Sequence, residues 1–405
     1  MEYVSGIKIR DIFLHNGNWW NLFLKHRNLI RPAIITNVLK LLVCRTSFLG
    51  YHSFICKKCG YTKKVPHSCK SRFCSSCGKK ATDIWIQSKF NTLPNTVWQH
   101  ITFTIPAELH NLFWLNRHLF NKVPKLAANI LLKLSKNQGF LPGIFLANHT
   151  FGRDLKRNFH IHLSITKGGL SLLNNYNSWI SNAFFFHNSI KKMWRYSLIS
   201  FLRNQYIKSK LKLPDHLKHI KSFNSFSSWL NFLYNKNWVV SLSKPSKNMK
   251  RNVEYLGKYL KRPPIGETRI KSFFNNFVSF VYIDHFNNTT DVTTLPAIDF
   301  ISRLISHIPD HYFRNIRYYG FLSNRLSSKL LPIALNILNS LPTTPYHQNH
   351  LQKLSWRIML KKYLNFDPLI CPTCKSILSF YNSVFPGLSL LSFHKEIANG
   401  YFQLI

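Results

Sequence analysis

One segment of the chain combines the pattern of a β-strand with two metal-ligating side chains. Residues 158–166 read Asn-Phe-His-Ile-His-Leu-Ser-Ile-Thr, and apolar and polar residues alternate throughout. Because successive side chains of a strand point to opposite faces, the apolar set faces a core while His160 and His162 project side by side from the other face. Two neighbouring imidazoles on a strand can chelate one divalent metal ion, although a solvated sheet face produces the same pattern. The rest of the sequence decides between these two interpretations.

The charge of the chain is strongly one-sided. Its 405 residues contain 55 Lys and Arg against 14 Asp and Glu, a formal net charge of +41. This imbalance opposes compact folding unless a polyanion relieves it, and nucleic acid is the natural partner because neutralised phosphates release counterions. Compositional drift towards Lys would not by itself remove the acidic residues. With 45% hydrophobic residues, the chain has enough apolar material for two or three folded domains.

The sequence contains no candidate membrane segment. Its apolar stretches are far shorter than the about 18 residues that a membrane span requires, and residues 1–10 lack the apolar stretch of a secretory signal. We therefore expect a cytoplasmic protein without membrane contact. In that compartment cysteines are more often metal ligands than disulfide partners.

Five of the eight cysteines lie between residues 56 and 77. Two knuckles of the form C-x2-C, Cys56–Cys59 and Cys74–Cys77, are each followed by glycine, which suits a turn that brings backbone amides to the sulfurs. Together they predict a tetrahedral four-sulfur zinc site of the structural type. Cys69 is a fifth cysteine that could replace one of these ligands. The isolated knuckle Cys371–Cys374 is weak evidence by itself and is also compatible with a simple turn.

The apolar periodicity predicts alternating helical and strand regions along the chain. Helices are expected around residues 34–42, 109–134, 175–235, 244–262 and 301–308; strands at 97–106, 158–166, 238–242 and within 273–300; and a Lys-Gly-Gly turn at 167–169. The expected segments are an N-terminal helical segment (1–45), a zinc-binding module (46–90), a catalytic domain (91–270), its DNA-contacting continuation (271–345) and a C-terminal tail (346–405).

Two tyrosines stand one helical turn apart near the end of the fourth predicted helix. Tyr255 and Tyr259 are at positions i and i+4, so they lie one above the other on the flank of an apolar stripe. Lys258 and Arg262 lie near them on the polar side. In isolation such a pair is most often plain packing on an amphipathic edge. A phenol is also a nucleophile when a base or a metal ion assists it, and the surrounding cations would hold a phosphodiester close.

Taken together, these motifs resemble a known group of proteins. The matching motifs are Cys56-x2-Cys59, Ser68-Cys69-x2-Arg72-x-Cys74-x2-Cys77, Thr102-Phe103-Thr104-x-Pro106, Phe151-Gly-Arg-Asp-Leu155, Asn158-Phe-His-Ile-His162, Tyr255-Leu-Gly-Lys-Tyr259 and Arg317-Tyr-Tyr-Gly320 with Arg325. In order and spacing they are similar to the His-hydrophobic-His (HUH) endonucleases, and among these to the transposases of the IS-91 insertion-sequence family. The resemblance extends over nearly the whole chain.

The resemblance implies an α+β fold in which helices pack on an antiparallel nuclease sheet, preceded by a helical segment and a small four-cysteine zinc module. It implies a transposase that nicks and rejoins single-stranded DNA through 5′-phosphotyrosine links in a rolling-circle-like reaction. On this basis Tyr255 and Tyr259 are the nucleophiles, and His160 and His162 hold Mg²⁺ or Mn²⁺. Phe159 stands where the family usually has proline, but the alternation of the strand is preserved.

Three points follow from the resemblance with less support from the residues. A third metal ligand is commonly needed, and the candidates are Asp154 and His149; Asp154 is preferred because Mg²⁺ favours hard oxygen ligands. Arg317, Tyr318 and Tyr319 could stack on and clamp a DNA strand, since guanidinium and aromatic planes bind unpaired bases, although core packing is an equally good interpretation of these three. Of the residues in this region, Arg317, Tyr319 and Arg325 are expected to contact DNA. The sequence has no G-x-x-x-x-G-K-[ST] motif, so a host helicase or an already single-stranded substrate is implied.

A non-catalytic function is also compatible with the sequence. A zinc-containing nucleic-acid-binding protein with exposed histidines would show the same charge and the same cysteine knuckles. The two hypotheses differ in whether His160 and His162 bind a metal ion and whether DNA is cleaved.

Overall fold

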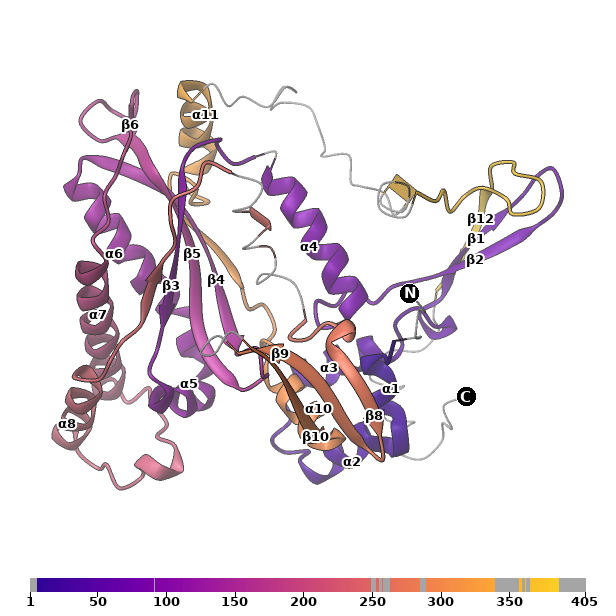
Figure 1. Ribbon diagram of the computed structural model, residues 1–405, viewed down its shortest axis with the longest axis horizontal. Helices are drawn as coiled ribbons and strands as arrows, with labels where there is room; N and C mark the ends of the chain where they lie inside the picture. The colour runs from indigo at the N-terminus through magenta and orange to yellow at the C-terminus, as the bar shows by residue number, and fades with distance from the viewer. Residues whose placement is uncertain are drawn as a thin grey trace.

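A computed structural model of the chain describes residues 6–90, 92–248, 253–254, 257, 263–284, 289–338, 357–358, 361 and 365–385. Within these ranges no helix combines the length and the apolarity needed to cross a membrane. The described part of the chain is an α+β fold with three antiparallel sheets and two large apolar cores, which confirms the expected fold class (Figure 1).

The largest sheet has six strands, and the predicted histidine strand is at its centre. Its order is β11-β4-β5-β3-β7, with β6 paired to the far end of β5. The strands are β3 (Trp98–Thr104), β4 (Phe140–Phe151), β5 (Arg157–Ser171), β6 (Trp179–Ile180), β7 (Val240–Leu242) and β11 (Ile316–Gly320). The predicted strands at 97–106 and 238–242 are therefore β3 and β7; β3 pairs directly with β5, and β7 pairs with the other edge of β3.

The turn expected at residues 167–169 is wrong, because β5 continues through both glycines to Ser171. A Cβ atom on Gly169 would lie 2.1 Å from the carbonyl oxygen of Leu141, and one on Gly168 would lie 2.3 Å from that of Ile180. These glycines are thus required by the close approach of neighbouring backbones and not by a chain reversal.

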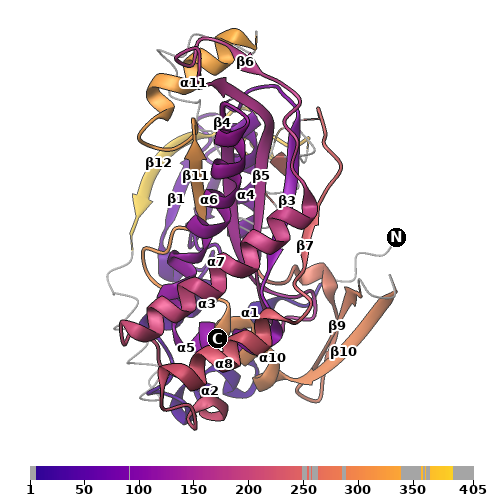
Figure 2. The ribbon, with the colours of Figure 1, turned by 90° about the vertical axis from the view of Figure 1, so that its left-hand side faces the viewer.

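The apolar face of this sheet is covered by four helices, as the alternation of β5 predicts. Ile161, Leu163 and Ile165 are fully buried there in a core that includes residues of α5 to α8. The helices are α5 (His110–Leu115), α6 (Val123–Asn137), α7 (His187–Ile207) and α8 (Phe223–Tyr234). Figure 2 shows them in front of the sheet. They confirm the helical character expected for 109–134 and 175–235.

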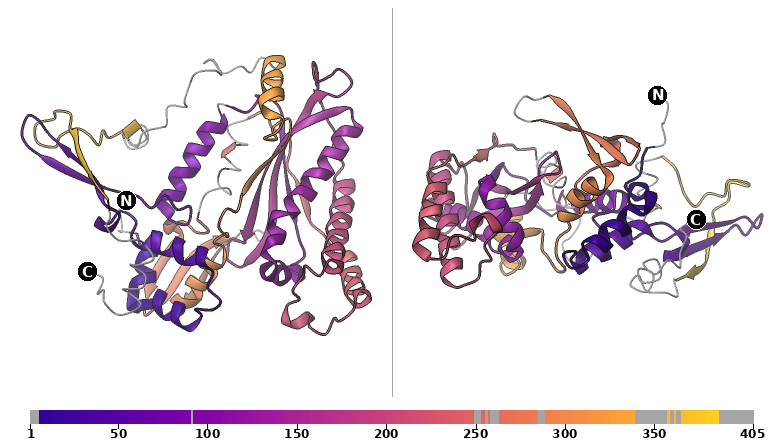
Figure 3. Two further views of the ribbon diagram at one scale, coloured as in Figure 1. Left: turned by 180° about the vertical axis from the view of Figure 1, so that it is seen from behind. Right: turned by 90° about the horizontal axis from the view of Figure 1, so that it is seen from below.

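The histidine face is covered by a different set of elements. Helix α4 (Ser75–Phe90) and helix α11 (Ser327–Ile337) contribute to a core that contains Trp98 and Phe145 from the sheet. The ring centroids of Trp85, on α4, and Phe145 lie 6.2 Å apart. The sheet therefore lies between α4 on one side and α6 and α7 on the other, as seen from behind in Figure 3.

A second core joins segments that are far apart in the sequence. Its elements are α1 (Ile9–Leu14), α2 (Asn18–Lys25), α3 (Pro32–Leu42), β8 (Ile270–Phe274), β9 (Phe277–Ile283), β10 (Thr290–Pro296) and α10 (Ala297–Ser306). Residues from all three N-terminal helices share this core with α10 and β9. Residues before and after position 45, and before and after position 270, thus contribute to the same core.

The third sheet is small and pairs a hairpin within residues 51–66 with a strand from the C-terminal end of the described chain. Its order is β12-β1-β2, formed by β1 (Tyr51–Ile55), β2 (Thr62–Pro66) and β12 (Ser379–Val384). The segment expected to be a tail thus supplies an edge strand to the zinc-binding module. Short 3₁₀ helices occur at η1 (His15–Gly17), η2 (Ser47–Leu49), η3 (Ala107–Leu109), η4 (Arg117–Asn121), η5 (Asp215–Leu217) and η6 (Glu267–Arg269).

Candidate functional site

Three histidines meet on the face of the large sheet opposite to the helices α5 to α8. His160 and His162 come from β5, and His149 from the neighbouring strand β4. The register pairs His149 with His160, and Ala147 with His162. Because directly paired residues of antiparallel strands share a face, all three imidazoles point to the same side. One potential ligand nitrogen from each lies within 4.8 Å of the others.

The hydrogen bonds around His160 assign its proton. Nδ1 of His160 lies 2.9 Å from the carbonyl oxygen of Asn158, which can only accept, so Nδ1 carries the hydrogen. Nε2 is then the nitrogen that offers a lone pair, and it lies 2.9 Å from Nδ1 of His149. Nitrogen atoms about 3 Å apart can coordinate one metal ion at usual bond lengths of about 2 Å. The three residues therefore fit a divalent metal ion.

A fourth histidine supports the cluster from strand β3. Nε2 of His100 lies 3.0 Å from Nδ1 of His162, and the hydroxyl of Thr102 lies 3.4 Å from the same atom. A partner on the second ring nitrogen of a ligand fixes its orientation and tautomer. In the sequence His100 is only a polar residue of a predicted strand, because the register in which β3 pairs with β5 is not visible there.

Burial keeps these imidazoles neutral. Desolvation lowers the pKa of His160 to about 4, against a partial opposing effect of the Asn158 carbonyl. Desolvation, followed by repulsion from His160, also lowers the pKa of His149 and of His162 well below the usual value. A neutral imidazole is the form that binds metal, so the cluster is poised for coordination at neutral pH.

Asp154, the preferred third ligand from the sequence, is not part of this group. Its carboxylate accepts a hydrogen bond from the backbone N–H of Lys156 at 3.1 Å and forms an ion pair with the side chain of Lys156 at 3.4 Å. These contacts hold Asp154 in the turn between β4 and β5. His149, the other candidate, occupies the third position instead.

The predicted tyrosine helix can be followed only through its described residues. Tyr255, Tyr259, Lys258 and Arg262 lie outside the described residues. Val253 is helical and buried in the core on the histidine face, together with Trp98, Phe145 and Ala147 of the sheet.

Gly257 lies against α4, since a Cβ atom there would be 2.4 Å from Cγ1 of Ile86. Val253 and Gly257 thus lie on the side of the sheet from which the histidines project.

The cysteines form two groups, and the predicted set of Cys56, Cys59, Cys74 and Cys77 is wrong as a single site. The groups are Cys44, Cys69, Cys74 and Cys77, and Cys56, Cys59, Cys371 and Cys374. The knuckle at residues 56–59 lies in the β1–β2 connection, at the tip of a hairpin that extends away from α4 (Figure 1). Sequence spacing identified the knuckles but could not show which ones face each other.

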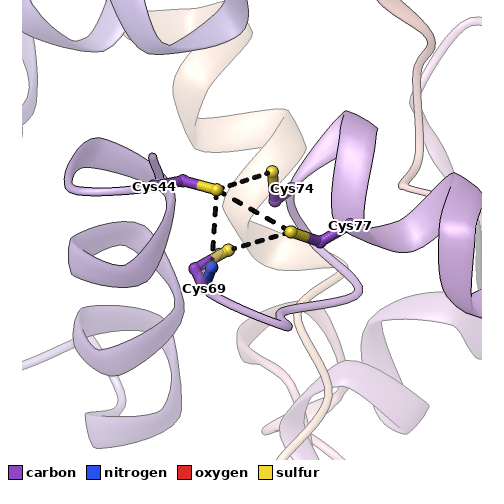
Figure 4. Close-up of side chains that lie close together, drawn as sticks. All are labelled: Cys44, Cys69, Cys74 and Cys77. Carbon is purple, nitrogen blue, oxygen red and sulfur yellow. Dashed lines mark hydrogen bonds between the residues drawn. The ribbon is translucent and has the colours of Figure 1, made fainter. Parts of the chain in front are cut away.

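The first group is built around the start of α4 (Figure 4). The sulfur of Cys44, just beyond α3, lies 3.7 Å from those of Cys74 and Cys77, and the sulfur of Cys69 lies 3.7 Å from that of Cys77. Four sulfurs around zinc at about 2.3 Å would be about 3.8 Å apart, so the group fits a tetrahedral ion. Hydrogen bonds from Cys69 and Cys74 lower the pKa of Cys44 to about 7, towards the thiolate form that zinc requires. Cys69, which the sequence suggested as an alternative ligand, belongs to this group. Cys44 also belongs to it, although it is not part of any C-x2-C knuckle.

Comparisons with known proteins agree with this arrangement. Residues 16–105 match a family model described as "Transposase zinc-binding domain", specific to IS-91 elements, and residues 143–329 match one described as "Putative transposase". The chain is 35% identical over 385 residues to the transposase for insertion sequence element IS801 of Pseudomonas savastanoi pv. phaseolicola, covering 94% of this chain and 91% of the relative. The chain belongs to the IS-91 family of insertion-sequence transposases.

A second relative of this IS-91 family member is "Putative transposase y4qJ" of Sinorhizobium fredii, 26% identical over 82% of this chain and 85% of the relative. No solved structure matches. The zinc-binding match includes all of the first cysteine group, and the match at 143–329 includes the three histidines.

The residues expected to contact DNA do not all lie near the histidines of this transposase. Arg317 and Tyr319 of β11 pair with Leu146 and Ile144, which belong to the core on the opposite face. Arg317 donates a hydrogen bond to Asn121 there at 2.7 Å. Arg325 is exposed in the turn before α11.

Tyr318 lies on the histidine face of β11, together with Ile316. It pairs with Phe145, and the ammonium of Lys89 on α4 lies 4.8 Å from its ring centre. Nothing in the sequence favours Tyr318 over its neighbour Tyr319, because the direction of each side chain depends on the register with β4.

Gly257→Ala is expected to lower the rate of DNA cleavage, because the added methyl group would collide with Ile86. Overpacking of this kind costs about 1–3 kcal/mol. Combining it with Ile86→Ala should restore part of the loss, whereas Ile86→Ala alone should have a small effect. Cleavage rates and melting temperatures of the four chains form a double-mutant cycle. Strictly additive effects would show that the two residues do not meet.

Proposed function

We propose that this IS-91 family transposase nicks and rejoins single-stranded DNA, with Tyr255 and Tyr259 as nucleophiles and a divalent metal ion on His149, His160 and His162. The observation that carries the proposal is the convergence of three neutral imidazoles on one sheet face with the described part of the tyrosine segment. A bound metal ion would act as a Lewis acid on the scissile phosphate. Three imidazole ligands favour Mn²⁺ over Mg²⁺, which prefers oxygen ligands.

The chemical step conserves the energy of the phosphodiester. The phenolic oxygen of one tyrosine forms a bond to phosphorus, the bond from phosphorus to the 3′ oxygen breaks, and that oxygen takes up a proton. The products are a 5′-phosphotyrosine and a free 3′-hydroxyl. In rejoining, a 3′-hydroxyl attacks the phosphotyrosine and the tyrosine is released with its proton. A second tyrosine allows the next junction to be cut while the first still carries DNA.

The charge of the chain supports a DNA substrate. A net charge of +41 gives strong, salt-dependent attraction to phosphates without sequence preference. Because the sequence has no G-x-x-x-x-G-K-[ST] motif, unwinding would fall to a host helicase, or the substrate would already be single-stranded. The non-catalytic alternative is less well supported, because the relative that is similar over nearly the whole chain is named as a transposase.

The deciding experiment is an assay for covalent protein–DNA adducts. With Mn²⁺ and a 5′-labelled or 3′-labelled oligonucleotide from the element's ends, the wild-type chain is expected to yield an adduct that retains the label on the 3′ side of the cut. Tyr255→Phe combined with Tyr259→Phe is expected to abolish the adduct, because the phenylalanine ring lacks the attacking oxygen. Each single substitution should leave one of the two cleavage steps.

Tyr282→Phe provides a matched control, since this tyrosine lies on β9 in the second core. It is expected to retain wild-type adduct formation. Undiminished cleavage by the double variant at positions 255 and 259 would contradict the assignment of the nucleophiles.

A further inference from the structure

The second cysteine group brings together two knuckles that are separated by more than 300 residues. Sγ of Cys56 lies 3.3 Å from Sγ of Cys374, and Sγ of Cys59 lies 3.5 Å from Sγ of Cys371. All four sulfurs lie within 4.8 Å of one another. Only the first knuckle lies within residues 16–105, the part of the chain that matches the zinc-binding family model.

The two knuckles have the same backbone hydrogen bonds. The N–H of Cys56 donates to the carbonyl of Tyr61 at 2.8 Å, and the N–H of Cys371 donates to the carbonyl of Ser376 at 2.8 Å. In both cases the acceptor is five residues further along the chain. Residues 371–374 thus have the hydrogen-bond geometry of the first knuckle, which the interpretation as a simple turn does not explain.

The residue after each knuckle shows the same conformation. Gly60 and Lys375 donate to the carbonyls of Cys56 and Cys371 at 2.9 and 3.0 Å, and their φ angles are +75° and +60°. A lysine rarely adopts this left-handed conformation, because its Cβ atom comes close to the following carbonyl oxygen. A residue keeps such a conformation where the surrounding structure requires it. Here the conformation of Lys375 closes the loop around the two cysteine sulfurs.

The neighbouring strands place the knuckles opposite each other. Strand β1 pairs with β12, with Ile55 opposite Ser379, so each knuckle lies next to the paired ends of the two strands. A small core packs behind the sulfurs; its buried members are Phe54, Cys56, Cys371 and Leu378. The C-terminal segment, residues 365–385, thus meets the β1–β2 hairpin through the β1–β12 pairing, the small core and a hydrogen bond from Nζ of Lys63 to the carbonyl of Pro368 at 2.8 Å.

We propose that Cys56, Cys59, Cys371 and Cys374 bind a second structural zinc ion, which fastens the C-terminal segment to the β1–β2 hairpin. Four thiolates in two knuckles are a donor set that selects zinc, and no ligand position is left for a substrate. Beside the β1–β12 pairing, the core behind the sulfurs has only four buried members, two of them ligand cysteines, which gives the ion a structural role at this end of the hairpin. The transposase would therefore contain two zinc ions, one for each cysteine group.

Metal analysis of the full-length chain tests the stoichiometry. Wild-type protein is expected to contain two zinc ions per chain by inductively coupled plasma mass spectrometry, and the Cys371→Ser, Cys374→Ser double variant is expected to contain one. Thr373→Ala is the matched control, because Thr373 is exposed within the knuckle and has no sulfur; it should retain both ions. One zinc ion in the wild type, or an unchanged content in the double variant, would overturn the proposal.

A second measurement on the wild-type chain needs no substitution. Cys59 is exposed, so it should react rapidly with an alkylating reagent if its thiol is free. In zinc-loaded protein Cys59 is expected to be protected, and a chelator should expose it together with Cys56, Cys371 and Cys374, as identified by peptide mass spectrometry. Rapid alkylation before chelation, or protection that is removed by a reductant and not by a chelator, would exclude a zinc site.

The structural role has its own readout. Loss of the second ion should increase tryptic cleavage after Lys375 at least tenfold, while cleavage within α6 and α7 stays at the wild-type rate. Unchanged cleavage after Lys375 in a chain that has lost one zinc ion would show that the ion does not fasten the segment.

Discussion

His149→Ala is expected to reduce the rate of DNA cleavage by about three orders of magnitude. The substitution removes one of three imidazoles from the β4–β5 cluster and with it the fixed position of the metal ion. A metal ion that acts as a Lewis acid contributes several kcal/mol to a transition state, and about 4 kcal/mol corresponds to a thousandfold change in rate. The measurement is single-turnover cleavage of a labelled oligonucleotide in saturating Mn²⁺, together with Mn²⁺ affinity from electron paramagnetic resonance.

Asp154→Asn is the control for this prediction. Asp154 is the ligand that hard-metal chemistry favours, but its contacts with Lys156 lie in the adjoining turn. An ion pair of this exposure is worth less than about 1 kcal/mol, so cleavage should change only a few-fold. The reverse result, with cleavage lost in Asp154→Asn and retained in His149→Ala, would contradict the three-histidine site.

The sequence predicted two of the three clustered histidines because their evidence is local. Alternation alone places His160 and His162 on one face of a strand and Ile161 in the core on the other. The position of the third histidine, His149, depends on the register between β4 and β5, which shifts on either side of the central pairs and so follows from the whole sheet. Chemical preference for oxygen ligands favoured Asp154, but the pairing of the strands places an imidazole at that position.

The cysteines show the same division between local and long-range information. Spacing identified each knuckle, since Cys56–Cys59 and Cys74–Cys77 each supply two cysteines to a four-cysteine group. Which knuckles combine is decided by the path of the chain between them. The hairpin β1–β2 moves the first knuckle away from α4, and α3 brings Cys44 to the second. No spacing rule includes a ligand such as Cys44 or a partner more than 300 residues away.

Helix α4 connects the first cysteine group with the histidine face. Cys77 lies in its first turn, and Trp85 and Ile86, two turns further on, belong to the core that includes Val253. Sixteen residues of helix span about 24 Å, so a single rigid element joins the two sites. The zinc ion expected in the first group would therefore hold the helix against which Gly257 lies.

Cys74→Ser is accordingly expected to unfold the N-terminal core and to abolish cleavage as a consequence. Cys69, Cys74 and Cys77 belong to the same apolar core as α1, α3 and α10. Structural zinc contributes about 10 kcal/mol or more in small zinc-dependent folds, which is comparable to the about 5–15 kcal/mol that stabilises a typical domain. The expected result is the loss of one zinc ion and of the main thermal transition seen by circular dichroism.

The exposed neighbour Ser76 supplies the control for this second prediction, and Ser76→Ala should melt and cleave like the wild type. The double variant at Cys371 and Cys374 should also keep its main thermal transition, because that group holds only a short segment to a hairpin. A wild-type thermal transition in Cys74→Ser would mean that burial of α3 and α4 stabilises the core without zinc. Cleavage activity in such a chain would then separate the zinc-binding module from the chemistry on the sheet.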